Sequence, residues 1–386
     1  MSSSDFIVIG AGLAGAAAAW HLAEAGHHVS VLERTTPGNH EGSSHGSARI
    51  FRYAYPEKAY TDLVVRARQG WDQLEAASGR RLITPTGSVD FGDLRDPRGL
   101  AAVLEASGVE HELLSADAAR ERFPQIAFDT EVLYHPDAGV LDALGTIEAM
   151  LELAQATGRA EVHTHWEAAG IRRTAGGFEV RSADGRSVTG AKVIVAAGGW
   201  LPALLGDLAL PAGFLESVPA FEVREEQAFH LPWREADESG AAYPAWPTFI
   251  HKRSEMQTYG LPGGRDAGFS GQKMAQYKGG PVLPSARDQS GLITEEMRRR
   301  VQDYAMRYLP GVVPEPYAEA TCLFTMTPNE DFVIDEADGV VLLSACSGHG
   351  GKFAPLLGEL AAGLATGAGT VPDRFRVAHH RAEAAR

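Results

Sequence analysis

The sequence predicts an α/β protein with a Rossmann-type dinucleotide-binding domain and a second, α+β domain that has a mixed or antiparallel sheet. Three observations predict this. A strand, a glycine-rich turn and a helix open the chain. Segments of the same character return at residues 145–199 and 340–365. The residues between these segments form short β-rich pieces and proline turns, so each domain should be assembled from separated parts of the chain.

The expected boundaries follow from this alternation. Residues 1–85, 146–217 and 322–386 should form the dinucleotide-binding domain, and residues 86–145 and 218–321 the second domain. A chain of 386 residues is long enough for two such domains.

The N-terminal segment has the order strand, turn, helix, strand. Residues 6–9 (FIVI) and 29–32 (VSVL) are mostly apolar and rich in Val and Ile, as expected of buried parallel strands, and an alanine-rich helix between them ends near residue 25. Further along, apolar residues recur at helical spacing over residues 60–77, and a shorter helix is expected over residues 97–107.

The turn between the first strand and helix has the pattern Gly10-x-Gly12-x-x-Gly15. Gly10 permits a tight turn, Gly12 lets backbone amides approach a pyrophosphate, and Gly15 allows the helix to pack closely on the strand. Glu33 follows the second strand, 18 residues after Gly15, where an acidic side chain binds ribose hydroxyls. The loop therefore predicts dinucleotide binding.

FAD is expected rather than NAD. The chain has one such loop, so no separate nicotinamide site is indicated. A strand ending in Ala-Ala-Gly198-Gly-Trp200 is common in FAD sites, and a second glycine-rich turn at residues 347–351 opens a helix that can direct amide groups at a flavin.

Composition excludes several other classes of protein. The formal net charge of −15 argues against binding to nucleic acid phosphates. Two cysteines provide no disulfide framework, and no His–Cys spacing indicates a metal site. No segment reaches the roughly 18 continuous apolar residues of a membrane span, and the first apolar stretch lacks a basic leader, so a cytoplasmic location is expected.

Three tracts resemble the monomeric sarcosine oxidase and N-methyltryptophan oxidase family, within the flavin amine oxidases related to D-amino acid oxidase. They are residues 44–52 (SHGSARIFR), 322–335 (CLFTMTPNEDFVID) and 347–353 (SGHGGKF). The resemblance implies that FAD is bound covalently, through the 8α carbon, to Cys322. A basic neighbour such as Arg49 or His45 should lower the thiol pKa.

The resemblance also implies roles for individual residues. Arg49 would lie against the flavin ring, and Arg52 with Lys352 would bind the substrate carboxylate, as a guanidinium and an ammonium do well. Lys273 would stabilise superoxide where dioxygen is reduced. The loop before it is longer than in relatives, so Lys278 remains an alternative.

The remaining residues expected at the site follow from the same tracts and turns. His45 and Tyr259 are candidates for the catalytic set, beside Arg49 and Lys273. The expected FAD contacts are Gly10, Gly12, Leu13, Ala14, Gly15, Glu33, Arg34, Ser44, His45, Arg49, Trp166, Gly198, Cys322, Gly348, Gly350, Gly351 and Lys352.

The substrate pocket departs from the family. Phe324 stands where sarcosine oxidase has a tyrosine, Leu261 where it has a phenylalanine, and Tyr277 near a family histidine, while Tyr259 is kept. The pocket loses a hydroxyl group and gains room, so a larger substrate than sarcosine is expected.

The resemblance thus implies an oxidase of N-methyl, N-alkyl or cyclic secondary α-amino acids that uses dioxygen, releases hydrogen peroxide and works as a monomer. Two alternatives remain. The first is a dehydrogenase that passes electrons to a partner, and the second is a non-catalytic flavin-bearing subunit.

Overall fold

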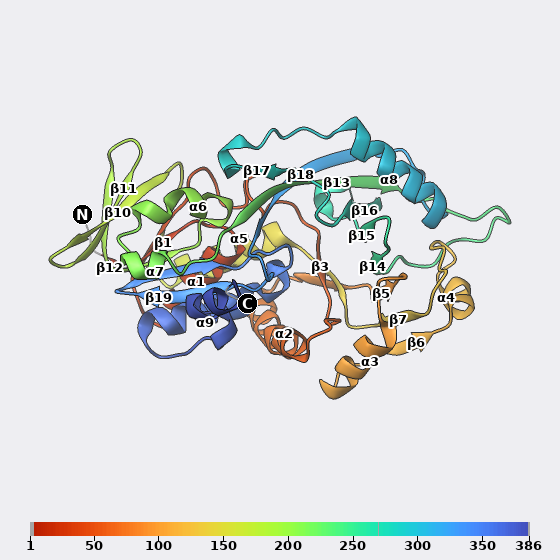
Figure 1. Cartoon of the computed structure of the whole chain (residues 1–386), viewed down its shortest axis with the longest axis horizontal. Helices are drawn as coiled ribbons and strands as arrows, with labels where there is room; N and C mark the ends of the chain where they lie inside the picture. The colour runs from red at the N-terminus through yellow and green to blue at the C-terminus, as the bar shows by residue number, and fades with distance from the viewer. Residues whose placement is uncertain (1–3, 269, 385–386) are drawn as a thin grey trace.

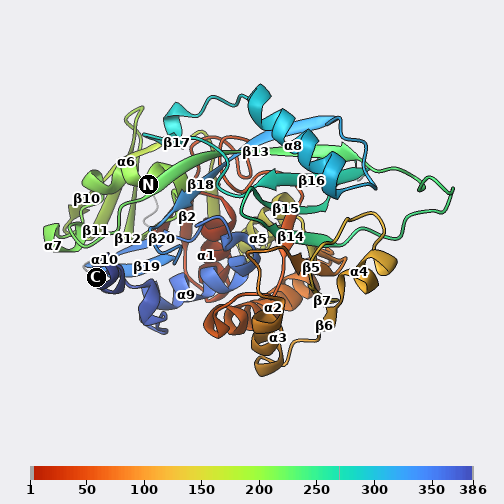
Figure 2. The same ribbon diagram turned by 45° about the vertical axis from the view of Figure 1, so that its right-hand side comes forward.

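The computed structural model describes residues 4–268 and 270–384. Two lobes lie side by side along the long axis of the molecule (Figure 1), and each contains its own large sheet. The turned view shows the strands β13 (Glu222–Pro232) and β18 (Ala318–Met326) running together along the top from one lobe into the other (Figure 2).

The first lobe is built on an eight-stranded sheet. Its central strands, β12 (Ser187–Val195), β1 (Ser4–Ile9), β2 (Val29–Leu32) and β9 (Ala160–His163), are parallel, and β20 (Val340–Ser344) joins β12 in the same direction. The antiparallel strands β10 (Ala168–Thr174), β11 (Gly177–Ser182) and β19 (Val333–Ala337) extend it.

Helices cover this sheet. The helix α1 (Leu13–Glu24) packs against α5 (Ala143–Ala156) and α9 (Ala354–Thr366), and α2 (Lys58–Ser78) packs on the latter two. The strands β2 and β20 are buried along their whole length, and β1 is buried from Phe6 to Ile9, as their near-continuous apolar sequences predict. The C-terminal α10 (Val377–Ala384) lies against β19.

The second lobe contains a nine-stranded mixed sheet in the order β17-β13-β16-β15-β14-β5-β7-β6, with β18 paired to β13. All pairs are antiparallel except β14 with β5. The bounds are β5 (Ser88–Phe91), β6 (Glu112–Leu114), β7 (Val132–His135), β14 (Thr248–Lys252), β15 (Gln257–Pro262), β16 (Gly271–Gln276) and β17 (Val282–Leu283).

Three helices flank the second sheet, and a small sheet joins the lobes. The helices are α3 (Pro97–Ala106), α4 (Ala116–Arg122) and α8 (Glu295–Tyr308). The small sheet consists of β3 (Arg49–Phe51), β8 (Gly139–Leu141) and β4 (Ile83–Pro85). The short helices α6 (Leu201–Leu204) and α7 (Ala212–Leu215) follow β12.

The predicted fold class is confirmed: a Rossmann-type lobe stands beside an α+β lobe with a mixed sheet. Two of the expected domain boundaries fall inside elements. Residue 146 lies within α5, and residue 322 lies within β18, a strand of the second sheet.

Candidate active site

One long cavity, of about 770 Å³, runs between the two sheets. At one end it is lined by the glycine turn after β1 and by the ends of β2 and β12. At the other end it is lined by one face of β13, β15, β16 and β18. On β15 the cavity lining includes Gln257, Tyr259 and Leu261, as the alternation of side chains along a strand predicts.

The turn after β1 is shaped for close approach by a ligand. Gly10 has a φ of +98°, and a Cβ there would lie 2.4 Å from the Ala196 carbonyl oxygen. A Cβ on Gly15 would lie 1.9 Å from the Gly10 oxygen, so Gly15 serves the packing of α1 and does not line the cavity. Gly12, Leu13 and Ala14 do line it.

The N-terminus of α1 opens into the cavity. Gly12 has no side chain to cap it, and the Ser44 hydroxyl accepts a hydrogen bond from the Leu13 amide at 3.2 Å. The other amide groups of the first turn and the positive end of the helix dipole therefore face the place where a pyrophosphate is expected.

Glu33 directly follows β2 at the same edge. Its carboxylate accepts hydrogen bonds from the Ala11 amide at 2.9 Å and the Thr35 amide at 3.0 Å, which hold it against the glycine turn. The neighbouring Arg34 lies over the Trp200 ring at 4.5 Å, and Trp166 is buried in the cavity wall. This end of the cavity has the carboxylate and the flat apolar surfaces that ribose and adenine require.

A second uncapped helical start also faces the cavity. Gly348, Gly350 and Gly351 line it, and no described side chain caps the short helical turn that begins after His349. A Cβ on Gly350 would lie 1.6 Å from the Ala345 oxygen, so only glycine fits there. Gly198 lines the cavity between the two turns. Two helix starts at one elongated cavity fit a dinucleotide such as FAD.

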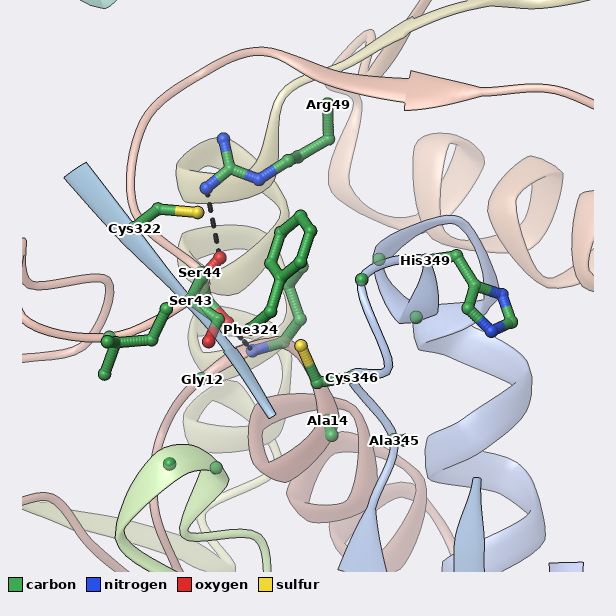
Figure 3. A pocket seen from close by; sticks show the side chains of 18 of the residues that line it. Gly12, Ala14, Ser43, Ser44, Arg49, Cys322, Phe324, Ala345, Cys346 and His349 are labelled. Carbon is green, nitrogen blue, oxygen red and sulfur yellow. Dashed lines mark hydrogen bonds between the residues drawn. The ribbon is translucent and has the colours of Figure 1, made fainter. Parts of the chain in front are cut away.

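Cys322 lines the cavity near two cations, Arg49 and Lys273, and Figure 3 shows the first of them next to the thiol. The guanidinium of Arg49 donates to the Ser43 oxygen at 3.0 Å and the Ala48 oxygen at 2.9 Å. The Lys273 ammonium donates to the same Ala48 oxygen at 3.3 Å. Burial raises the pKa of the Cys322 thiol, and the positive charges of Arg49 and Lys273 oppose this increase.

The expected effect of a basic neighbour on this thiol is therefore only partly right. Arg49 and Lys273 do favour the thiolate, but burial outweighs them. His45 does not contribute a charge, because burial and the nearby Arg49 lower its pKa to about 3. His45 is thus neutral near pH 7 and lines the cavity as an uncharged imidazole.

The structure separates the two candidate lysines. Lys273 is 8% exposed and lines the cavity from β16, where its pKa is lowered to about 8 by burial and by Arg49. Lys278 follows the end of that strand with a φ of +53°, does not line the cavity, and forms an ion pair with Glu330.

Arg52 and Lys352 lie near one another in the cavity, as expected of a carboxylate site. The Arg52 guanidinium lies over the Tyr55 ring at 4.6 Å, and the Lys352 ammonium donates to the Tyr55 hydroxyl at 2.9 Å. Lys352 also donates to the His349 oxygen at 2.7 Å. Burial and the charge of Arg52 lower the pKa of Lys352 well below 10.5.

Aromatic and apolar side chains complete this end. Tyr259 and Leu261 on β15 line the cavity, and so does Phe324 on β18. The Tyr277 ring lies 6.3 Å from the Phe324 ring, and its hydroxyl donates to Glu330 at 2.9 Å. Figure 3 shows Phe324 beside Cys322 and Arg49, and the His349 ring turned away from them.

Several cavity residues were not among those expected from the sequence, and three of them carry polar groups towards its substrate end. Tyr55 and Lys252 line the substrate end. Glu226 also lines the cavity, and it lies directly opposite Cys322 in the β13–β18 pairing. The resemblance names none of them, and only the strand register shows which side chains turn inward.

A family model described as FAD dependent oxidoreductase matches residues 5–364, almost the whole described chain. The chain belongs to this family. It is therefore a flavin-dependent oxidoreductase, and the expected resemblance to the sarcosine oxidase group is confirmed by its relatives.

Among the curated relatives, the monomeric sarcosine oxidase of Bacillus sp. (strain NS-129) is 30% identical over 380 residues, which cover 96% of this chain and 94% of the relative. The N-methyl-L-tryptophan oxidase of Yersinia pestis is also 30% identical, over 371 residues that cover 93% and 94%. Among solved structures, a Tyr258Phe mutant of NikD superposes on this chain with a TM-score of 0.84 at 27% identity. The superposition covers 98% of this chain and 97% of that one, and NikD is described as an unusual amino acid oxidase essential for nikkomycin biosynthesis.

Within the part of the chain that the structure describes, no helix combines the length and apolarity needed to cross a bilayer.

Proposed function

We propose that this chain is an FAD-dependent oxidase of secondary α-amino acids, N-methyl, other N-alkyl or cyclic, that releases an imine and hydrogen peroxide. The observation that carries the proposal is the position of Arg52 and Lys352, two cations near one another in the cavity that also holds Cys322 and Lys273. The names of the relatives, sarcosine oxidase and N-methyl-L-tryptophan oxidase, support this substrate class.

Arg52 and Lys352 would bind and orient the substrate carboxylate. Without an anion, burial and the Arg52 charge disfavour the charged form of Lys352. A bound carboxylate supplies the missing opposite charge, so Lys352 would be protonated in the complex. The Tyr55 hydroxyl and the His349 carbonyl fix the Nζ atom before the substrate arrives.

Cys322 would hold the flavin through a thioether, with the glycine turn and Glu33 binding the rest of the FAD. When bound, the flavin supplies the two-electron acceptor for oxidation of the carbon–nitrogen bond. Lys273 would provide the positive charge that stabilises superoxide when dioxygen is reduced, and Arg49 keeps that region cationic.

The direct test is a screen of N-methyl and cyclic amino acids with detection of peroxide, together with anaerobic reduction of the flavin. We expect reduction by several secondary amino acids, fast reoxidation in air and one peroxide per turnover. A flavin that no amino acid reduces would refute the proposal. A flavin that amines reduce but that air reoxidises poorly would replace oxidase with dehydrogenase.

Covalent attachment has its own test. After denaturation in acid and filtration, the yellow colour should stay with the polypeptide of the wild type and pass into the filtrate for Cys322→Ala. Free FAD released from the wild type would disprove the thioether.

Sarcosine should be a poor substrate. Phe324 and Leu261 offer the cavity no hydroxyl group, and the loss of one such contact costs about 0.5–1.5 kcal/mol. A larger apolar substituent recovers about 25 cal/mol for each Å² that it buries. Steady-state comparison of sarcosine, N-methyltryptophan, proline and pipecolate measures this, and the highest kcat/KM for sarcosine would contradict it.

A further inference from the structure

A cation at the substrate end of the cavity has no anionic partner among the described residues. Lys252 is the last residue of β14, is half-buried and lines the cavity. Its ammonium lies 5.9 Å from the centre of the Tyr277 ring. Burial, Arg95 and Arg52 lower its pKa, and Glu330 and Asp90 offset this only in part.

The nearby carboxylates are already engaged. Glu330 forms an ion pair with Lys278 and accepts a hydrogen bond from the Tyr277 hydroxyl at 2.9 Å. Asp90 is fully buried and paired with Arg95. A substrate carboxylate bound by Arg52 and Lys352 would still leave the charge of Lys252 unmatched.

Strand register places Lys252 on the face that holds the substrate. Lys252 lies directly opposite Gln257 across the β14–β15 hairpin, and both side chains line the cavity. Along β15, Gln257, Tyr259 and Leu261 point to the same side. Leu261 is opposite Lys273, so Lys252 and Gln257 occupy the end of this face that is farther from Lys273 and Cys322.

We propose that Lys252 and the amide of Gln257 bind an acidic group at the end of the substrate side chain, so that the preferred substrates are N-alkyl or cyclic α-amino acids with a second carboxylate. The inference rests on the proposed function, because Arg52 and Lys352 determine which carboxylate of the substrate lies near the flavin. A carboxylate satisfies both the ammonium and the amide donors.

Binding can be measured without turnover. The holoenzyme is titrated with glutarate and with butyrate, neither of which has an amine to oxidise, and the flavin absorbance is followed. Glutarate should bind the wild type about tenfold to a hundredfold more tightly than butyrate, as expected for a hydrogen bond between charged groups. Lys252→Met should bring the two affinities close together. The inference would be overturned if the wild type bound glutarate and butyrate with similar affinity, or if the ratio of the two affinities were the same in Lys252→Met as in the wild type.

Turnover gives the second readout. N-methyl-L-glutamate is compared with its neutral isostere N-methyl-L-glutamine, and the ratio of their kcat/KM values should fall from about tenfold or more in the wild type to about one in Lys252→Met. Lys252→Glu should invert the preference, towards N-methyl-ornithine over N-methyl-glutamate. Lys58→Met removes one exposed ammonium of α2 and is the matched control for overall charge, so its ratio should equal that of the wild type.

The two ideas fail in different ways. If the flavin is reduced by neutral secondary amino acids as well as by acidic ones, and Lys252→Glu does not change the preference, the acidic subsite is wrong and the proposed oxidase stands. If no secondary amino acid reduces the flavin but glutarate binding still depends on Lys252, the proposed oxidase is wrong and the anion site stands.

Discussion

Removing the charge of Glu226 should stabilise the protein, and more so as the pH rises. The side chain is 2% exposed, and one carboxylate oxygen accepts hydrogen bonds from the Gly279 amide at 3.0 Å and the Gly280 amide at 3.4 Å. The other oxygen, Oε1, is buried without a hydrogen-bond partner among the described residues. Burial raises the pKa of this carboxyl from 4.5 to about 7.

The direction and size of the effect follow from this pKa. The folded state holds the proton more tightly than the unfolded state, so stability is lost as pH rises from 4.5 to about 7. At 1.36 kcal/mol per pKa unit, the loss is about 3 kcal/mol once both states are ionised. A neutral amide at this position does not incur that loss.

The assay is urea unfolding of wild-type and Glu226→Gln holoenzyme at pH 5 and pH 8.5, followed by circular dichroism. The stability of the variant relative to the wild type should increase between these pH values by about 2–3 kcal/mol. A relative stability that is the same at both pH values would refute the reasoning.

Glu225→Gln is the matched control. Glu225 is also buried, but its two oxygens accept hydrogen bonds from the Ser290 amide, the Ser290 hydroxyl and the Gly291 amide. Replacing this satisfied carboxylate should destabilise the protein, by about 1–3 kcal/mol.

Three further predictions concern the cofactor and its reactions. Because the pKa of Lys273 is about 8, reoxidation of the flavin should slow as pH rises through 8. The flavin of Lys273→Met should be reoxidised slowly at every pH, while its reduction by amine stays fast. Stopped-flow mixing of the enzyme with amine and then with oxygen measures the two rates. Arg52→Ala should weaken substrate binding by on the order of a hundredfold in anaerobic titrations, with normal flavin content. Gly10→Ala should lower both flavin content and Tm, because its Cβ would lie 2.4 Å from the Ala196 oxygen at a φ of +98°.

Local motifs explain what the sequence could predict. The glycines at positions 10, 12 and 15 depend only on the strand and helix that flank them, and both were recognisable from their apolar periodicity. The tract that carries Cys322 is contiguous, and so is the turn that carries Lys352. Their resemblance to the sarcosine oxidase family can therefore be recognised without knowledge of the fold.

Residues that depend on strand register could not be predicted in the same way. Glu225 and Glu226 are adjacent and both buried, yet they point to opposite faces of β13. Lys252 ends β14, where a lysine is usually solvated, and only the pairing with Gln257 places it in the cavity. The sequence left Lys273 and Lys278 as alternatives because the long preceding loop obscured where β16 ends, and only the structure shows that Lys273 lies on this strand and lines the cavity.

The position of Cys322 in the second sheet has a consequence for how the molecule unfolds. The glycine turn and Glu33, which would hold the dinucleotide, belong to the first sheet, whereas β18 is paired with β13 in the second. A thioether at Cys322 would therefore make FAD a cross-link between the two lobes. The lobes could separate from one another only if the dinucleotide left its binding site in the first lobe and became exposed to solvent. The holoenzyme should unfold in one cooperative transition, while Cys322→Ala, with its cofactor free to leave, should unfold one lobe at a time.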